Sequence, residues 1–327
     1  MKQAVLVFAI ALVITLAIGP AVIHYLRKMK FGQKILEIGP KWHMNKQNIP
    51  TMGGFMFIIG IAAAVIIGNI VMGEISISSL AVLGLAVAYG AVGLVDDYAK
   101  IKKKENAGLT PKQKLVLQIL VAGVFILVLF LKSSSLPQLW IPFTGVSFSW
   151  PWPLYIVFAA FVIVGADNAV NLTDGIDGLA ASVTLPVAVF FVFVGFRRGD
   201  MGVVIFAAAL AGALLGFLRY NFNPAKVFMG DTGSLFLGGA VAGLAFACEM
   251  PLILLLVGLI YIIETLSVIL QVTYFKATHG KRLFKMAPIH HHFEMCGWGE
   301  KKIVLVFTGI TVVLCLLAYH VALAPLF

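Results

Sequence analysis

Five polar clusters interrupt an otherwise apolar chain, and each carries side chains that can hold a metal ion, a phosphate or a sugar. The first is the pair Asp96 and Asp97 at the end of an apolar run, with Lys100 one helical turn further on. Burying two adjacent carboxylates beside a membrane is costly unless a cation offsets their charge. Mg²⁺ prefers hard oxygen ligands together with substrate phosphates. The pair therefore predicts a Mg²⁺ site, against the plainer interpretation of a solvated helix end.

The second cluster repeats an amide or a carboxylate at every third position, at Asn168, Asn171, Asp174 and Asp177. On a helix this spacing makes a slowly drifting polar stripe, and the glycines that follow predict that the helix ends in a tight loop. These groups suit the imide edge of a base, sugar hydroxyls and an N-acetyl group. The spacing does not match a calcium loop of the EF-hand type in any frame. Helix capping by the two aspartates is the plainer alternative.

The third cluster runs from Asn221 to Ser234, and within it Gly230 and Gly233 bracket Asp231 before an apolar helix begins. Free N–H groups at that helix start favour a phosphate. Asp231 is a candidate third Mg²⁺ ligand, and Phe228 is a candidate to stack on a base. A simple capped turn is the alternative, and no phosphate-binding loop of the Walker type occurs in the chain.

The fourth and fifth clusters carry less specific signals. Three adjacent histidines, residues 290–292, point in different directions on any regular backbone, so we expect phosphate contact or proton transfer from them and not a zinc site. A solvated loop is the alternative there. The fifth cluster, residues 46–54, opens an apolar run with a turn and two glycines.

The elements that position these clusters are membrane helices. Of the 327 residues, 61% are hydrophobic and 12% are charged, whereas soluble domains are roughly 45–50% apolar and about 25% charged. The apolar runs are long enough to cross a ~30 Å hydrocarbon core as helices. We therefore expect one all-α polytopic domain, residues 1–327, with about ten transmembrane helices. The predicted spans are 4–25, 52–72, 77–95, 114–131, 153–168, 178–196, 201–218, 234–248, 251–275 and 302–324.

The placement of Lys and Arg sets the expected orientation. Alternate connections carry 20 of the 24 basic residues, and the other side with both termini carries 4. Basic connections stay in the cytoplasm, so both termini are expected on the outer side and the five clusters at the cytoplasmic face. The net charge of +10 then reflects topology and attraction to anionic lipid, and it requires no nucleic acid. The three cysteines are scattered and predict neither a disulfide framework nor a metal site.

The motifs in combination resemble a known family of transferases. These motifs are Asp-Asp-Tyr from position 96, Asn-x₂-Asn-x₂-Asp-Gly-x-Asp-Gly from 168, Gly-Asp-Thr-Gly-Ser from 230 and Ala-Pro-Ile-His-His-His-Phe-Glu from 287. The chain is similar from end to end to the polyprenyl-phosphate N-acetylhexosamine-1-phosphate transferases. Thr51-Met52 after Pro50, where the N-acetylglucosamine-type relatives usually carry Pro-Arg, and Ala287-Pro288 favour the phospho-N-acetylmuramoyl-pentapeptide transferase branch.

The resemblance implies the reaction, the membrane and the site. UDP-N-acetylmuramoyl-pentapeptide and undecaprenyl phosphate would give lipid I and UMP with Mg²⁺, in a multi-pass homodimer of the bacterial cell membrane with a cytoplasmic active site. The implied catalytic residues are Asp96, Asp97, Asp231 and His290, and the three aspartates are also the implied metal ligands. The implied substrate-binding residues are Lys46, Thr51, Lys100, Lys114, Asn168, Asn171, Asp174, Asp177, Asn221, Phe228, Gly230, Ser234, Gln271 and His291.

The resemblance also implies that span 251–275 is bent and forms part of a groove for the lipid.

The residue that meets the phosphates and the function each have alternatives. Lys112 is an alternative to Lys114, because the loop before them varies in length. The rival functions are a sister transferase that uses UDP-N-acetylglucosamine and, from another class, a cation-coupled transporter, for which only Glu264 lies inside a predicted span.

Overall fold

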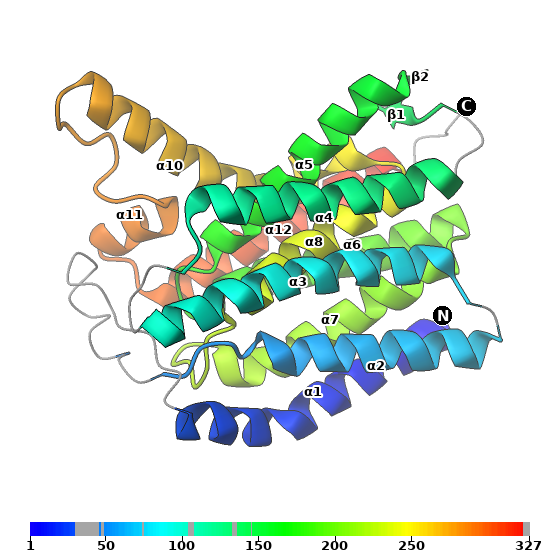
Figure 1. The fold of residues 1–327 in the computed structure, drawn as a ribbon, viewed down its shortest axis with the longest axis horizontal. Helices are drawn as coiled ribbons and strands as arrows, with labels where there is room; N and C mark the ends of the chain where they lie inside the picture. The colour runs from blue at the N-terminus through cyan, green and yellow to red at the C-terminus, as the bar shows by residue number, and fades with distance from the viewer. Residues whose placement is uncertain are drawn as a thin grey trace.

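Nine helices are long and apolar enough to cross a membrane in the part of the chain that the structure describes. The computed structural model describes residues 1–29, 46, 49–73, 75–103, 108–132, 136–144 and 146–322. The nine helices form one bundle, in which α5 and α10 are tilted against the others (Figure 1). They are α1 (Lys2–Lys28), α2 (Gly54–Met72), α3 (Ile77–Lys103), α4 (Pro111–Lys132), α5 (Trp152–Thr173), α6 (Leu179–Arg198), α7 (Met201–Asn221), α10 (Leu259–Ala277) and α12 (Glu300–Ala322).

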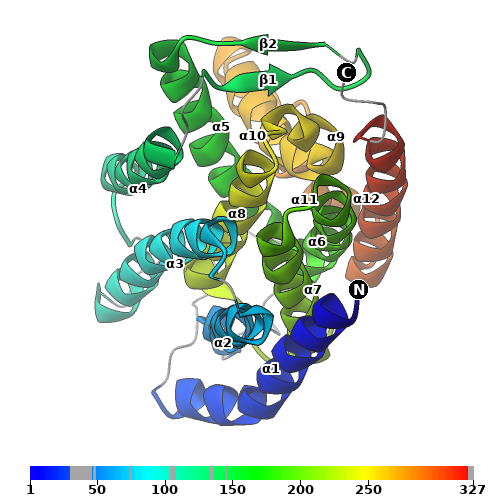
Figure 2. The same ribbon diagram turned by 90° about the vertical axis from the view of Figure 1, so that its right-hand side faces the viewer.

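One of the ten predicted spans forms a helix that differs from these nine in composition and burial. The predicted span 234–248 forms helix α8 (Gly230–Ala247), which is not among the nine candidate spans. Its first turn is polar and five of its residues are glycine, so its composition is less apolar than that of a lipid-facing helix. Helix α8 is instead almost entirely buried and packs against α3, α5, α2 and α6 (Figure 2).

The predicted span 251–275 is broken, as the family resemblance implied. It consists of a short 3₁₀ turn (Pro251–Ile253), helix α9 (Leu254–Val257) and helix α10, with Gly258 between α9 and α10. Beyond the break, α10 leans out from the bundle at the end where α11 (Ile289–Met295) lies (Figure 1). Leu266, Ile269 and Leu270 are exposed on it, and in a membrane these side chains face lipid.

Two elements depart from the expected succession of membrane helices. Strands β1 (Gln138–Trp140) and β2 (Ser147–Ser149) form an antiparallel hairpin with Leu139 opposite Phe148, and this hairpin crosses one end of the bundle (Figure 2). The histidine run, for which a solvated loop was the plainer alternative, forms helix α11. The chain is therefore predominantly α-helical with one small β-hairpin.

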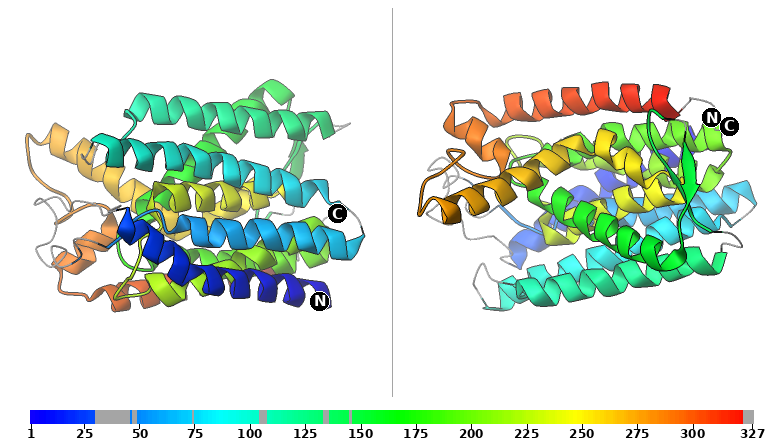
Figure 3. Two further views of the ribbon diagram at one scale, coloured as in Figure 1. Left: turned by 60° about the horizontal axis from the view of Figure 1, so that its bottom comes forward. Right: turned by 90° about the horizontal axis from the view of Figure 1, so that it is seen from above.

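The two ends of the bundle differ in chemistry. Helix α1 begins and helix α12 ends at the same end of the molecule (Figure 3). The acidic and histidine motifs lie at the opposite end, where α3 and α5 end and α4 and α8 begin. The basic segment 30–45 belongs to the same predicted side, but it lies outside the described residues.

Candidate active site

The aspartate pair lies within a helix and its two members point to different partners. Helix α3 continues to Lys103, so the predicted end of this span at residue 95 was too early. Asp97 accepts hydrogen bonds from the backbone N–H of Asp231 at 3.2 Å, from the backbone N–H of Thr232 at 2.9 Å and from the Thr232 hydroxyl at 2.8 Å. These N–H groups at the start of α8 have no partner within their own helix. Asp97 therefore caps α8 from a neighbouring helix.

Asp96 faces the chain that connects α3 to α4. Its Oδ1 accepts from the backbone N–H of Leu109 at 2.7 Å, and its Oδ2 lies 2.6 Å from the Lys100 ammonium group. The side chain is 3% exposed, and Gly108 lies so close to it that a Cβ there would approach the carboxylate to 2.5 Å. Asp96 is thus fixed at the edge of the site by both the helix and the following loop.

Asp231 is the centre of the site, because two lysines and an amide converge on it. Its Oδ2 lies 3.0 Å from Lys100 and 2.9 Å from Lys114, and its Oδ1 accepts from Asn171 at 3.1 Å. Lys112 is exposed on the outer face of the same helix. Of the two lysines, Lys114 is the one that contacts the acidic centre in this structure.

The three aspartates form the only group of metal-capable side chains found among the described residues. Asp96, Asp97 and Asp231 each offer an oxygen, and these oxygens lie within 4.8 Å of one another. The ammonium group of Lys100 lies 2.6, 3.7 and 3.0 Å from the carboxylates of Asp96, Asp97 and Asp231. The three carboxylates together therefore attract a positive charge to the space between them. Hard carboxylate oxygens are the ligands that Mg²⁺ prefers, so the residues present fit that metal.

The stripe of amides and carboxylates on α5 is divided among several partners. Asn171 lies in the acidic centre and also donates to the Ser234 hydroxyl at 2.7 Å. Asn168 points to the side and donates to Gln118 at 3.0 Å and to the Val164 carbonyl at 2.9 Å. The predicted end of the helix in a tight loop is confirmed, because α5 ends at Thr173.

The two aspartates beyond the helix have different environments. Asp177 is buried, with Lys46 at 2.6 Å from Oδ1 and the backbone N–H of Ala225 at 2.9 Å from Oδ2. Asp174 is half-buried and caps α5. Burial, reinforced by the charges of Asp231, Asp97 and Asp177, raises the pKa of Asp174 well above its usual value. Lys46 and Asp177 therefore stabilise the loop as a pair, whereas Asp174 is held beside the negative centre.

The weak motif at residues 49–54 is brought against the Gly-Asp-Thr-Gly-Ser loop. The Phe228 N–H donates to the Pro50 carbonyl at 2.9 Å, and the Gly53 N–H donates to the Phe228 carbonyl at 2.8 Å. Gly230 has φ +70°, and a Cβ there would lie 2.6 Å from the Asp97 carboxylate and 2.8 Å from the Thr51 hydroxyl. Thr51 therefore borders the acidic centre, although it lies 180 residues before Asp231 in the sequence.

Asn221 and Gln271 hold backbone segments near the site. The Asn221 amide is buried and donates to the Val227 carbonyl at 2.9 Å, which closes the loop before α8. Gln271 on α10 accepts from the backbone N–H of Leu283 at 3.1 Å and of Phe284 at 2.8 Å. Both residues fix loops in this structure, and neither contacts the acidic centre through these bonds.

The first two histidines of the run bind different glutamates, although their ring centroids lie 4.2 Å apart. His290 is fully buried, and its Nδ1 lies 2.9 Å from Oε2 of Glu264 on α10. Its Nε2 lies against Gly175, because a Cβ there would collide with this nitrogen. His291 pairs with Glu294 at 2.6 Å. Glu264, the residue that fitted a transporter, is thus the partner of a histidine in the described structure.

Two residues at the site, Gln118 and Gly93, were not singled out from the sequence. Gln118 contacts Asp167 and Asn168, and its signal in the sequence was a single amide in an apolar run. Gly93 lies where α3 touches α8, and a Cβ on it would overlap the Asp231 carbonyl. No sequence signal distinguishes this glycine from the others in α3, because its role comes from a contact between distant helices.

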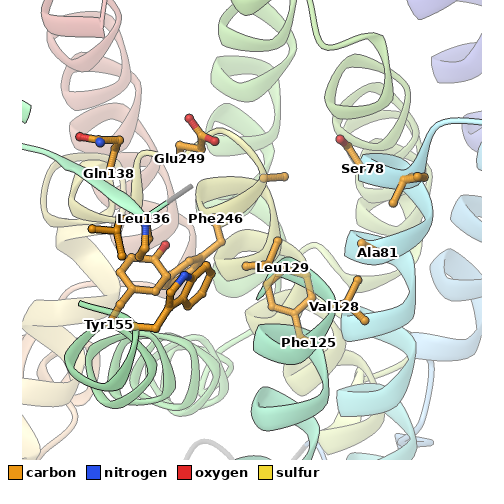
Figure 4. A pocket seen from close by; sticks show the side chains of 14 residues that line it. Ser78, Ala81, Phe125, Val128, Leu129, Leu136, Gln138, Tyr155, Phe246 and Glu249 are labelled. Atoms are coloured by element: carbon orange, nitrogen blue, oxygen red, sulfur yellow. The ribbon is translucent and has the colours of Figure 1, made fainter. Parts of the chain in front are cut away.

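A separate cavity opens at the opposite end of the bundle. It has a volume of about 390 Å³ and lies between the hairpin and the ends of α3, α4, α5 and α8 (Figure 4). Its walls are mainly aromatic and aliphatic, with Phe125, Tyr155 and Phe246 inside and Glu249 at the rim. It has none of the basic and acidic groups of the site described above.

Comparison with known proteins places the chain in a family. Residues 79–249 match the model of glycosyl transferase family 4. A phospho-N-acetylmuramoyl-pentapeptide-transferase of Clostridium perfringens strain 13 is 49% identical over 315 residues, which cover 96% of this chain and 97% of the relative. Proteins of the same name from Clostridium acetobutylicum and Listeria monocytogenes serotype 4b are 48% and 46% identical over 303 residues each, and these matches cover 92% and 93% of this chain and 93% of each relative.

The matched region contains the acid pair, the polar stripe on α5 and the Gly-Asp-Thr-Gly-Ser loop. The full-length matches extend over the histidine helix as well. The chain therefore belongs to glycosyl transferase family 4 and, within it, to the family of the phospho-N-acetylmuramoyl-pentapeptide transferases.

Proposed function

We propose that the chain transfers phospho-N-acetylmuramoyl-pentapeptide from its UDP-linked donor to undecaprenyl phosphate and releases UMP, and so forms lipid I for peptidoglycan synthesis. The observation that carries this proposal is the convergence of Lys100, Lys114 and Asn171 on Asp231, beside Asp96 and Asp97. Phosphoryl transfer depends mainly on positioning and on the neutralisation of phosphate charge. A site with two lysines and three carboxylates at a metal-binding distance supplies both.

Mg²⁺ is the proposed metal, held by Asp231 with Asp96 and Asp97 in reach, and when bound it would neutralise phosphate charge during the transfer. Asp97 differs from the other two, since it already accepts three hydrogen bonds from α8. Its first role is therefore to hold Asp231 in place, whereas the charged partners of Asp231 and Asp96 are lysines that can turn to phosphate when the metal binds.

The lysines and the amide are assigned to the phosphates. Lys100 and Lys114 now contact carboxylates, and they are the cations nearest to an incoming pyrophosphate. A phosphate monoester has a second pKa of about 6, so the lipid phosphate is largely dianionic at neutral pH. It can attack the donor directly, and Asp96 serves as a base only for the protonated fraction. This direct route requires no covalent intermediate on an aspartate.

The choice of donor rests on Thr51 and on the histidine helix. Thr51 borders Gly230 at the acidic centre, in the position where the sister branch usually has Pro-Arg. His290, His291 and Gln271 lie on α10 and α11, which flank the loop after α5. We assign this side to the nucleotide-sugar and the exposed face of α10 to the lipid, in a homodimer whose termini lie outside the cell.

One assay tests the reaction, the metal and the donor together. UMP release by purified protein with undecaprenyl phosphate is measured across a Mg²⁺ titration, with UDP-N-acetylmuramoyl-pentapeptide or UDP-N-acetylglucosamine as donor. We expect turnover with the first donor only, and loss of turnover in Asp231→Asn. Glu249→Gln, an exposed acid at the far end of the bundle, is the matched control and is expected to behave as the wild type.

Each arm has an opposing outcome. Equal rates with both donors would place the chain in the sister branch. An active Asp231→Asn with an unchanged Mg²⁺ requirement would show that Asp231 is only a helix-start residue.

The orientation in the membrane is tested separately. A cysteine introduced at position 136 should react with an impermeant thiol reagent on intact cells, and one at position 110 should be protected. The reverse pattern would place the acidic centre outside the cell.

A further inference from the structure

Helix α4 carries Lys114 into the site but is among the least enclosed of the membrane helices. Only 22% of its span is buried, compared with 83% for α7, and it packs mainly against α3 and α5. Apolar contacts between helices in a bilayer compete with equally apolar lipid tails. Such contacts alone give a weak preference for one register of α4 over another, although Lys114 has to lie 2.9 Å from Asp231.

One polar residue of α4 lies deeper in the bundle. Gln118 is the only polar side chain between Lys114 and Lys132, and it is 1% exposed. Its Nε2 donates to Asp167 Oδ2 at 2.6 Å, and its Oε1 accepts from Asn168 at 3.0 Å. Its backbone carbonyl also accepts from the Tyr89 hydroxyl of α3 at 3.0 Å. Gln118 therefore fixes α4 to both of its neighbours.

The same spacing of one helical turn occurs on both helices. Gln118 follows Lys114 by four residues on α4, and Asn171 follows Asp167 by four residues on α5. Gln118 pairs with Asp167 at one level, and Lys114 and Asn171 meet Asp231 at the next level. Asp167 in turn packs on α8, since a Cβ at Gly238 would collide with its Cα. The Gln118–Asp167 hydrogen bond thus links the position of Lys114 to α8, the helix that carries Asp231.

Stability alone does not account for this arrangement. Asp167 is fully buried, and its Oδ1 has no hydrogen-bond partner in the part of the chain that the structure describes. A buried acid with an unsatisfied oxygen within a membrane span is costly. In some proteins, buried polar groups of this kind specify a single geometry at a cost in stability.

We propose that Gln118 and Asp167 are positioning residues for the transferase reaction: their hydrogen bond sets the register of α4 against α5 and α8 and so holds Lys114 at Asp231. The inference rests on the proposed function for its kinetic consequence. The structural consequence, a displaced Lys114, does not depend on which reaction the site catalyses.

The first test measures Lys114 directly. Gln118→Met is nearly isosteric and removes both side-chain hydrogen bonds. The protein is treated with a water-soluble acylating reagent, and modification of Lys114 is quantified by mass spectrometry relative to exposed Lys112 on the same helix. We expect Gln118→Met to raise the acylation of Lys114 several-fold and to leave Lys112 unchanged. Leu120→Ala, at a lipid-facing position of α4, is the control and should show the wild-type ratio.

The second test asks whether the kinetic effect passes through Lys114. A displacement of about 1 Å costs on the order of 100-fold in rate, so we expect kcat of Gln118→Met to fall between roughly 10-fold and 100-fold. In a Lys114→Ala background the same substitution should cost less than about 2-fold, because coupled residues are not additive. A purely structural defect would reduce both backgrounds equally and would overturn the proposal.

A second pair of variants tests the same hydrogen bond in case Gln118→Met does not fold. Asp167→Asn keeps an acceptor for Gln118, whereas Asp167→Leu removes it, so the asparagine variant should retain more activity and more protection of Lys114. Equal loss in both variants, or wild-type acylation of Lys114 in Gln118→Met, refutes the positioning role. If the wild type has no transferase activity but Lys114 still becomes reactive in Gln118→Met, the proposed function fails and the register inference stands.

Discussion

Replacing Gly93 by alanine should inactivate the protein, although the residue carries no chemical group. Gly93 lies on α3 one turn before the aspartate pair, where the backbone of α8 touches it. A Cβ at this position would overlap the Asp231 carbonyl and would lie 2.6 Å from the Thr232 nitrogen. Both neighbours are backbone atoms of a buried helix, so they cannot rotate away as a flexible side chain would.

The displacement follows from the contact distances. Ordinary van der Waals contact of a Cβ begins at 3.4 Å, so the Thr232 nitrogen at 2.6 Å alone requires a shift of about 0.8 Å, and the closer Asp231 carbonyl requires the start of α8 to move further from α3. That shift stretches the hydrogen bonds from α8 to Asp97 and moves Asp231 relative to Lys100. A misplacement of about 1 Å costs on the order of 100-fold in rate, and overpacking of this kind costs about 1–3 kcal/mol in stability.

The assay compares two glycines of one helix. UMP release and the melting temperature in detergent are measured for Gly93→Ala and for Gly84→Ala, whose Cβ would meet nothing within 4 Å. We expect a loss of roughly 100-fold for Gly93→Ala and no loss for Gly84→Ala. Wild-type activity in Gly93→Ala would show that the α3–α8 contact does not set the geometry of Asp231. Equal loss in both variants would show that alanine is harmful anywhere in α3.

Lys114→Ala should reduce kcat by about two orders of magnitude, as removal of a charge-stabilising donor does, and Lys112→Ala should leave it unchanged; similar losses in both would refute the assignment of Lys114. Glu264→Ala should lower the melting temperature more than Glu264→Gln, because the alanine leaves the buried His290 without its hydrogen-bond partner. Equal melting temperatures of the two variants would contradict this role of Glu264. Since burial raises the pKa of Asp174, the folded state favours its protonated form and loses stability as pH rises. Asp174→Asn should therefore raise the melting temperature increasingly from pH 4 to pH 8, and a pH-independent difference would refute the assignment.

The sequence by itself determined the membrane class and the chemical inventory of the site. The length and apolarity of the runs follow from the thickness of a bilayer, so helix positions were predicted to within a few residues at most ends. The structure and the comparisons confirm a multi-pass helical protein of the predicted family. Of the three adjacent histidines, His290 and His291 bind different glutamates although their ring centroids lie only 4.2 Å apart.

The predicted end of the third span was wrong for a physical reason. The hydrophobic pattern ends at residue 95, but α3 continues to Lys103. Asp96 and Asp97 find partners in the following loop and on α8, so the helix has no cause to stop before them. Helix α8 lies where a span was predicted, and its place inside the bundle follows from glycines that allow the close approach of α3.

Only the tertiary structure decided which of these groups act together. The contacts of Lys114 with Asp231, of Glu264 with His290 and of Thr51 with the Gly230 loop all join residues that are far apart in the sequence. Local propensity and periodicity carry no information on such pairs, because each contact depends on how two helices are rotated and shifted against each other. For Lys114, we propose that the register of α4 is set by the buried hydrogen bond between Gln118 and Asp167.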